Sequence, residues 1–223
     1  MSSAANPVVL RSMTEEIGPG EFYPVVGVGP HPKPWPTNPH FDPDLLEHGD
    51  RRNVLNKYRY WSVAAIVAEL DKTRSTFHVA IENWQHDLNI GSIVRTANAF
   101  NAAGVHIIGK KDWNRRGAMV TDKYLHVYHH PDVNTFKSWA QDHNLPVLAI
   151  DNIEGSISLE TAKLPKGCIF LFGQEGPGLS DEAKDCASTL LSIQQHGSTR
   201  SMNASAAGAI VMFAWGLQHL SVD

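Results

Sequence analysis

The sequence predicts an α/β fold in which a mainly parallel sheet carries helices on both faces. From residue 77 onward, short apolar runs typical of buried strands alternate with helix-length segments, and this alternation is typical of parallel sheets. Polar, glycine-containing loops follow two of these runs, residues 168–172 and 189–193. Ligands of such sheets bind beyond the carboxyl ends of the strands. We therefore expect a functional pocket between these two loops.

Composition limits the class of protein. The 223 residues are 42% hydrophobic and 19% charged, which is enough apolar material for a packed core. The net charge of -4 means that nucleic-acid binding would need a local basic patch. The two cysteines lack paired spacing, so neither a disulfide framework nor a zinc site is expected. No apolar run reaches membrane-span length and no signal-peptide pattern opens the chain, so we expect a cytoplasmic protein without a membrane segment.

The N-terminal part differs from the rest. Residues 1–50 are rich in Pro, Gly and Ser, and residues 53–72 have helical spacing of apolar side chains, with Asn53 as a candidate cap. We assign residues 1–75 to an N-terminal arm plus helix and residues 76–223 to the main domain. Arg51, Arg52 and Arg59 make the helix start strongly basic, with aromatic residues between them. This pattern indicates either a solvated helix face or a platform for phosphates and bases.

The main domain begins with a predicted strand at 77–82, a polar loop, and a helix at 90–103 that Gly104 would end. The apolar stripe of that helix contains Ile90, Ile93 and Val94. Arg95 lies about 140° around the helix from Ile90 and so points away from the stripe.

The following strands are predicted at 105–109, 125–128 and 146–150, with a helix at 132–143 capped by Asp132. The loop 112–123 is polar and basic. Lys110, Lys111, Arg115 and Arg116 are candidate phosphate contacts, and a solvated charged loop is the alternative. The last helix, 203–220, is small-residue-rich at its start and then apolar nearly all round, which indicates burial, for example against a second subunit.

The glycine-rich loop 173–178 limits the chemistry. It lacks the Lys-Ser/Thr pair of a P-loop, and Glu175 would repel phosphates, so a cationic or hydroxyl-bearing ligand is favoured. The sequence has no nucleophile elbow and no HExxH motif, and its 12 histidines lack ligand spacing. We therefore expect no metal.

Three stretches together resemble the motifs of the SpoU (TrmH-like) branch of the SPOUT superfamily of RNA 2'-O-ribose methyltransferases. They are Asn-Ile-Gly-Ser-Ile-Val-Arg-Thr-Ala-Asn-Ala-Phe at 89–100, Leu-Phe-Gly-Gln-Glu-Gly-Pro-Gly-Leu at 171–179 and Ser-Met-Asn-Ala-Ser-Ala-Ala-Gly at 201–208. They occur in family order and spacing. One departure is Asn101, near which the family usually has a glycine; this bears on the helix end.

The resemblance implies a C-terminal trefoil knot, an obligate homodimer, an RNA substrate (tRNA or rRNA), and S-adenosyl-L-methionine bound by the loops 150–155, 172–178 and 193–203. The implied cofactor-binding residues are Ile150, Asp151, Phe172, Gly173, Gly176, Ile193, Ser201, Met202 and Ala206. The implied catalytic residues are Arg95, Asn89, Glu175, Ser201 and Asn203.

The implied reaction is methylation of a ribose 2'-hydroxyl, with Arg95 of the facing subunit acting on that hydroxyl. Because arginine stays protonated, we expect it either to stabilise the developing alkoxide or to act beside a substrate phosphate that takes the proton. Asn89 would aim Arg95, Glu175 and Asn203 would hold the cofactor or brace the Arg95 loop, and Ser201 would either face the ligands or cap a helix. The alternatives are a non-catalytic RNA-binding protein, an RNA base methyltransferase, or an enzyme for another nucleotide.

Overall fold

The computed structural model describes residues 27–84, 89–174 and 176–221. The chain divides into two compact units, Met1–Trp61 and Ser62–Asp223. The stretch 62–75, which we grouped with the N-terminal arm, therefore belongs to the second unit.

The first unit is organised around a buried carboxylate. Asp50 is fully buried, and its side chain accepts hydrogen bonds from Arg52 Nε at 2.9 Å, from Arg52 Nη2 at 2.8 Å and from the backbone N of Tyr60 at 3.0 Å. Burial by itself would raise the pKa of Asp50, but the hydrogen bonds and the charge of Arg52 outweigh it and lower the pKa to about 2. The unit also contains α1 (Pro43–His48) and the 3-10 turn η1 (Asn56–Tyr58).

The prediction of a continuous helix at 53–72 is wrong. The structure has η1, then Tyr60 in a left-handed conformation with φ of 63°, then α2 (Val63–Leu70). The side chain of Ser62 caps α2, so Asn53 does not start a helix. The physical reason is the Asp50 cluster, which requires the Tyr60 N–H and therefore interrupts the helical backbone.

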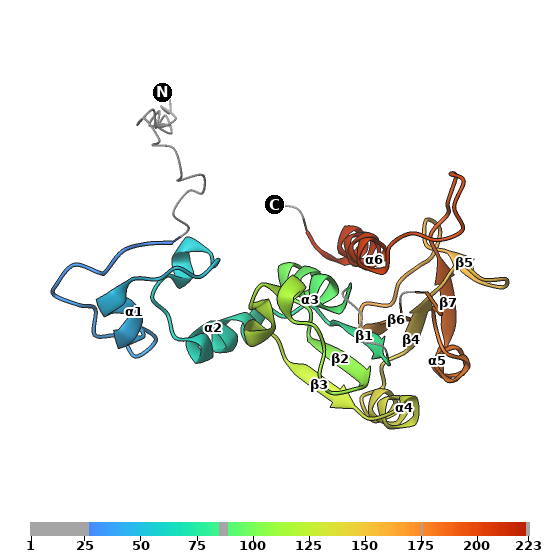
Figure 1. Ribbon diagram of the computed structural model, residues 1–223, viewed down its shortest axis with the longest axis horizontal. Helices are drawn as coiled ribbons and strands as arrows, with labels where there is room; N and C mark the ends of the chain where they lie inside the picture. Colours follow the sequence, from blue (N-terminus) through green and yellow to red (C-terminus); the bar gives the residue numbers. More distant parts are fainter. Residues whose placement is uncertain (1–26, 85–88, 175, 222–223) are drawn as a thin grey trace. The chain divides into compact units, whose positions relative to one another are not determined.

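The second unit contains a seven-stranded sheet in which every neighbouring pair is parallel, in the order β3-β2-β1-β6-β4-β7-β5 (Figure 1). The strands are β1 (Phe77–Asn83), β2 (Gly104–Gly109), β3 (Val127–His130), β4 (Val147–Ile150), β5 (Ile157–Ser158), β6 (Cys168–Phe172) and β7 (Thr189–Ser192). The helical elements of this unit after α2 are η2 (Asp71–Thr73), α3 (Asn89–Ala99), η3 (Arg116–Ala118), η4 (Thr121–Tyr124), α4 (Val133–Asp142), α5 (Asp181–Cys186) and α6 (Ala204–His219).

Helices cover both faces of the sheet, which confirms the predicted α/β class. Successive residues of β6 alternate between two cores: Phe170 and Phe172 pack with α3 and α6, whereas Ile169 and Leu171 pack with α4 and α5. Figure 1 shows α3 and α6 side by side on one face and α4 on the other. A central parallel strand buried on both sides reads as a continuous apolar run, as 168–172 does.

Two predicted elements of the second unit differ from the structure by more than one residue at an end. The helix after β1 ends at Ala99, because Asn101 adopts a left-handed conformation with φ of 49°, and Gly104 begins β2. The strand expected at 125–128 occupies 127–130, because η4 extends to Tyr124 and precedes it.

Three histidines form a hydrogen-bonded chain across neighbouring strands. His78 Nδ1 lies 3.1 Å from His106 Nε2, and His106 Nδ1 lies 2.9 Å from His130 Nε2. Burial, and then the neighbouring imidazoles, lowers the pKa of His78 to about 4 and that of His106 to about 2. Trp139 and Tyr128 pack against His106. The chain is therefore neutral at pH 7.

We predict that acid destabilises the second unit through this chain. An unfolded histidine takes up a proton near pH 6.5, while the buried imidazoles do not, so the free energy of unfolding falls as pH drops below about 6.5. His106→Gln keeps a donor and an acceptor but does not titrate. Between pH 6 and 4.5, urea unfolding should show that the variant loses less free energy of unfolding per pH unit than the parent, by about 1 kcal/mol. Equal slopes for the two proteins would contradict this.

Candidate functional site

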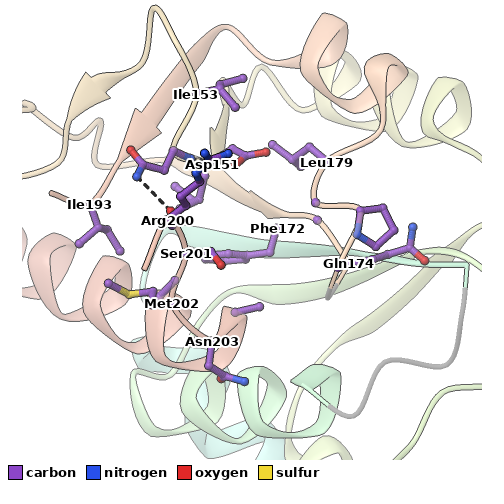
Figure 2. Close-up of a pocket in the computed structure, with 18 of the residues that line it drawn as sticks. Asp151, Ile153, Phe172, Gln174, Leu179, Ile193, Arg200, Ser201, Met202 and Asn203 are labelled. Atoms are coloured by element: carbon purple, nitrogen blue, oxygen red, sulfur yellow. Dashed lines mark hydrogen bonds between the residues drawn. The ribbon is translucent and has the colours of Figure 1, made fainter. Parts of the chain in front are cut away.

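Three adjacent strands of the sheet, β6, β4 and β7, end beside one cavity of about 560 Å³. Its walls come from the loop after each strand and from the start of α6 (Figure 2). Lys184 of α5 also lines it. The volume is within the range of small-molecule sites. The structure thus brings together the two loops that the sequence pattern singled out and the loop after β4 that the family resemblance added.

The glycine loop after β6 is closed by its own backbone. Gln174 N donates to Gly178 O at 3.0 Å and Gly178 N donates to Gln174 O at 3.1 Å. A Cβ at Gly173 would overlap the backbone of Gly178, and Gly178 itself has φ of 75°. These two positions therefore require glycine, and the absence of side chains brings the loop backbone up to the cavity.

The cavity combines an apolar part with a few charged side chains. Phe172, Ile193 and Met202 supply apolar surface, and Asp151 follows the end of β4. Asn152 Nδ2 donates to Arg200 O at 3.3 Å, which ties the first loop to the third (Figure 2). Such a site can hold a flat ring against apolar side chains while a carboxylate accepts hydrogen bonds from hydroxyl or amino groups.

Asn203 connects the cavity to α3. Its Oδ1 accepts from Ser205 N at 3.0 Å and from Ala206 N at 3.3 Å, which caps α6, and its Nδ2 donates to Asn89 Oδ1 at 2.8 Å. Asn89 is buried at the first turn of α3. A displacement of α3 would therefore move Asn203 and change the cavity wall.

The predicted site residues fall into three groups. Those that line the cavity are Ile150, Asp151, Phe172, Gly173, Gly176, Ile193, Ser201, Met202 and Asn203. Ala206 does not line it, because Ala204 and Ala207 are the helix residues that face the cavity. Asn89 does not line the cavity but is hydrogen-bonded to Asn203, which does. Arg95 is exposed on α3 and is not part of the cavity lining of its own chain. Glu175 lies outside the described residues.

Sequence reasoning did not single out two cations at the cavity. Arg200 lies in the third loop, and Lys184 lies on α5, where its Nζ is 3.1 Å from Asp181 Oδ1. Arg200 is the only charged side chain between 193 and 203, which was an available signal. The sequence offers no such signal for Lys184, because its position at the cavity depends on how α5 packs.

A buried carboxylate beside the glycine loop was also missed. Glu82 is fully buried; its Oε1 accepts from Ser180 Oγ at 2.7 Å and from Trp84 Nε1 at 3.0 Å, and its Oε2 accepts from Ser180 N at 2.9 Å. Trp84 N in turn donates to Gln174 Oε1 at 3.2 Å. Glu82 thereby fixes the end of β1 to both ends of the glycine loop. A glutamate ending an otherwise apolar strand was the sequence signal.

The candidate RNA-binding cations differ in their surroundings. Lys110, Arg115 and Arg116 are exposed beyond the carboxyl end of β2, as is Lys111. Arg51 is exposed in the first unit, where Arg52 is bound to Asp50. Arg59 Nη1 donates to Arg52 O at 2.5 Å, so this guanidinium also supports the first unit internally. RNA contacts by these residues stay predictions.

Two other kinds of site are not found among the residues that the structure describes. Within residues 27–84, 89–174 and 176–221, no cluster of three or more His, Cys, Asp or Glu side chains could hold a metal ion. No helix in these ranges has both the length and the apolar character needed to cross a membrane.

Comparison with known proteins defines the class. Residues 76–213 match the model of the SpoU rRNA Methylase family. An uncharacterized tRNA/rRNA methyltransferase of Mycobacterium sp. (strain KMS) is 33% identical over 60% of this chain and 44% of its own length. A tRNA (guanosine(18)-2'-O)-methyltransferase of Thermus thermophilus is 26% identical over 64% of this chain and 75% of its own. The chain therefore spans less than half of the first relative.

Solved structures agree with this. An AdoMet-bound rRNA methyltransferase from Sinorhizobium meliloti has a TM-score of 0.60 at 25% identity, covering 68% of this chain and 61% of that one. An A. aeolicus TrmH/SpoU tRNA modifying enzyme has the same fold, with a TM-score of 0.62 at 20% identity over 70% of this chain and 81% of that one. The fold is that of SPOUT methyltransferases. This protein belongs to the SpoU family, which confirms the resemblance of the three motifs.

We predict that Glu82→Gln loosens the glycine loop. The amide cannot accept at both of its terminal atoms, so one donor among Ser180 and Trp84 loses its partner in a buried place. The free energy of unfolding should fall by about 2 kcal/mol in urea titrations. Glu182→Gln, an exposed change on α5, should stay within about 0.5 kcal/mol of the parent. Equal effects of the two substitutions would refute the role of Glu82.

Proposed function

We propose that this protein transfers the methyl group of S-adenosyl-L-methionine to a ribose 2'-hydroxyl of tRNA or rRNA. The observation that carries the proposal is the cavity formed by three loops beyond β6, β4 and β7 in a chain of the SpoU family. The names of the relatives support an RNA substrate, and the Thermus thermophilus name supports the ribose position. Such substrates make the cytoplasm the proposed compartment.

The cavity residues fit S-adenosyl-L-methionine. The glycine loop offers backbone groups and space, Phe172 and Ile193 offer apolar surface for a ring, and Asp151 offers a carboxylate for hydroxyl or amino groups. When bound, the sulfonium supplies an electrophilic methyl group, so the reaction needs no covalent enzyme intermediate. Arg200 and Lys184 are the cations available to a carboxylate of the ligand.

Arg95 is proposed to act on the ribose hydroxyl. It is exposed on α3 and does not line the cavity of its own chain, so a second copy of the protein would have to supply it. A guanidinium that stays charged stabilises a developing alkoxide, and a substrate phosphate is then the acceptor of the proton. The Asn89–Asn203 hydrogen bond would fix the helix that carries Arg95. Ser201, at the cavity, and Glu175 keep their proposed roles at the cofactor or the loop.

A homodimer is proposed from the surface of α6. Ile210, Phe213 and Leu217 are 40%, 57% and 67% exposed at spacings of three and four residues, and Leu220 extends this stripe. An exposed apolar stripe on an otherwise buried helix is typical of a subunit interface. A trefoil knot in the C-terminal segment belongs to the same proposal.

The decisive experiment is mass spectrometry of tRNA and rRNA nucleosides from cells with and without the protein. A 2'-O-methylnucleoside that disappears supports the proposal, whereas loss of a base-methylated nucleoside supports a base methyltransferase. A protein that binds RNA but shows no cofactor affinity in calorimetry would be a non-catalytic RNA-binding protein.

We predict that Arg95→Ala abolishes most methyl transfer while cofactor affinity stays unchanged. Loss of a group that stabilises transition-state charge costs about a hundredfold to a thousandfold in kcat. Single-turnover transfer and calorimetry measure the two quantities separately. Lys72→Ala, an exposed cation on the 3-10 turn η2, serves as the control. Full activity of Arg95→Ala would remove the arginine from the mechanism.

The interface prediction concerns Phe213 and Leu217. Replacing both with Asp places charges in the proposed interface, so the protein should sediment as a monomer and lose methyl transfer. A separate complementation test uses chains with the unaltered α6 surface. Mixing Arg95→Ala chains with Asp151→Ala chains should restore activity if the arginine acts across the interface, because one site of each mixed dimer then has an intact cavity and an intact Arg95. Additive loss without recovery would place it within one chain.

A further inference from the structure

The segment between β2 and β3 has an exposed apolar tip near its middle. Met119 and Val120, which join η3 to η4, are 60% and 53% exposed. Both adopt left-handed backbone conformations, with φ of 47° and 68°. This conformation is uncommon for any side-chain-bearing residue and a clear outlier for a β-branched one such as valine. Two neighbouring residues are thus held in an unfavourable geometry that points apolar side chains at solvent.

Close packing against α3 fixes the backbone next to the tip. A Cβ at Gly91 would lie 2.8 Å from Ala118 N, and a Cβ at Gly117 would lie 2.8 Å from Ser92 N. Ala118 is fully buried, and Thr121 Oγ1 donates to its carbonyl at 2.7 Å. The backbone on either side of Met119 and Val120 therefore has little freedom, so the tip is rigid.

This packing places the tip beside the proposed active site. Gly91 and Ser92 lie in the first turn of α3, directly after Asn89. Asn89 is bonded to Asn203 at the wall of the cavity. The same α3 carries Arg95. A substrate that approaches Arg95 would thus come close to the tip.

The surroundings of the tip are basic. Five cations between residues 110 and 123 outnumber two carboxylates, in a chain whose net charge is -4. The cations are Lys110, Lys111, Arg115, Arg116 and Lys123, and all are exposed. Asn83 Nδ2 donates to Lys110 O at 2.7 Å and to Asp112 O at 2.9 Å, which fixes the start of this segment to β1. The charge complements a polyanion, while the apolar tip complements the faces of bases.

We propose that Met119 and Val120 form a wedge that inserts between stacked bases of the RNA and exposes the ribose of the target nucleotide. This inference rests on the proposed function and adds a substrate class to it, a nucleotide inside base-stacked RNA. Apolar side chains on a rigid support are what nucleic-acid-binding proteins insert between base steps, and flanking cations hold the phosphates. The backbone strain at the tip then has a function, since it keeps the two side chains extended.

The test is the double variant Met119→Asn/Val120→Asn. Asparagine tolerates the left-handed conformation, so the variant should be as stable as the parent or more stable in urea. Its kcat/KM on total tRNA and rRNA from cells lacking the protein should fall about tenfold, because the wedge contact is lost. Binding to poly(U), whose bases need little unstacking, should be unchanged. Ile157→Asn, which removes a 51% exposed apolar side chain on β5, should leave all three measurements near the parent.

A second measurement follows the base directly. Once the modified nucleotide is known, 2-aminopurine can be placed next to it in a transcript. Its fluorescence should increase when the parent protein binds, because the base unstacks, and should not increase with the double variant. The double variant Arg115→Gln/Arg116→Gln should instead weaken binding to tRNA and binding to poly(U) equally, and it should lower the salt dependence of both.

Three results would overturn the wedge. The double variant could methylate folded RNA as fast as the parent, it could lose poly(U) affinity to the same extent, or it could shift sedimentation toward monomer, which would place the tip between two copies of the chain. A parent protein that methylates no RNA would refute the proposed function instead. Failure of the wedge and failure of the function are thus distinguishable.

Discussion

The hydrogen bond from Asn203 to Asn89 is the contact on which the candidate site depends. One side chain caps α6, lines the cavity and fixes the first turn of α3. The two residues are 114 positions apart in the chain, so the bond exists only because the parallel sheet brings α3 and α6 onto one face. Asn89 is buried, so leaving its side-chain oxygen without this donor would be costly. The proposed catalytic helix and the proposed cofactor cavity are therefore positioned together.

The glycine loop is positioned by a different kind of contact. The carboxylate of Glu82, near the end of β1, accepts hydrogen bonds from Ser180 and Trp84, while Trp84 N donates to Gln174. A buried carboxylate is stable only where donors surround it, so this cluster permits one arrangement of the loop. Glycines then allow the loop backbone to approach the cavity. The Glu82 contacts hold the glycine loop in place, and its glycines let the backbone line the cavity. Both features favour a preformed site.

Charge is distributed locally, not globally. The chain is acidic overall, yet the exposed cations after β2 gather around a strained apolar tip, and the histidine chain inside the sheet stays uncharged. Arg52 and Arg59, which looked like surface cations in the sequence, instead support a buried aspartate in the first unit. The pattern of charges in a sequence therefore says less about partners than the burial of each charge does.

The sequence by itself determined the α/β class and the strands at 77 and 168, because local apolar periodicity and glycine-rich turns are properties of short segments. Most residues of the cavity were implied by the resemblance of the three motifs to a known family. The sequence could not determine that Lys184 and Arg200 face the cavity, or that Glu82 holds the glycine loop. The broken helix at Tyr60 and the left-handed pair Met119 and Val120 were equally beyond it. Each of these depends on contacts between residues far apart in the chain, and such contacts override local propensity once the sheet has assembled.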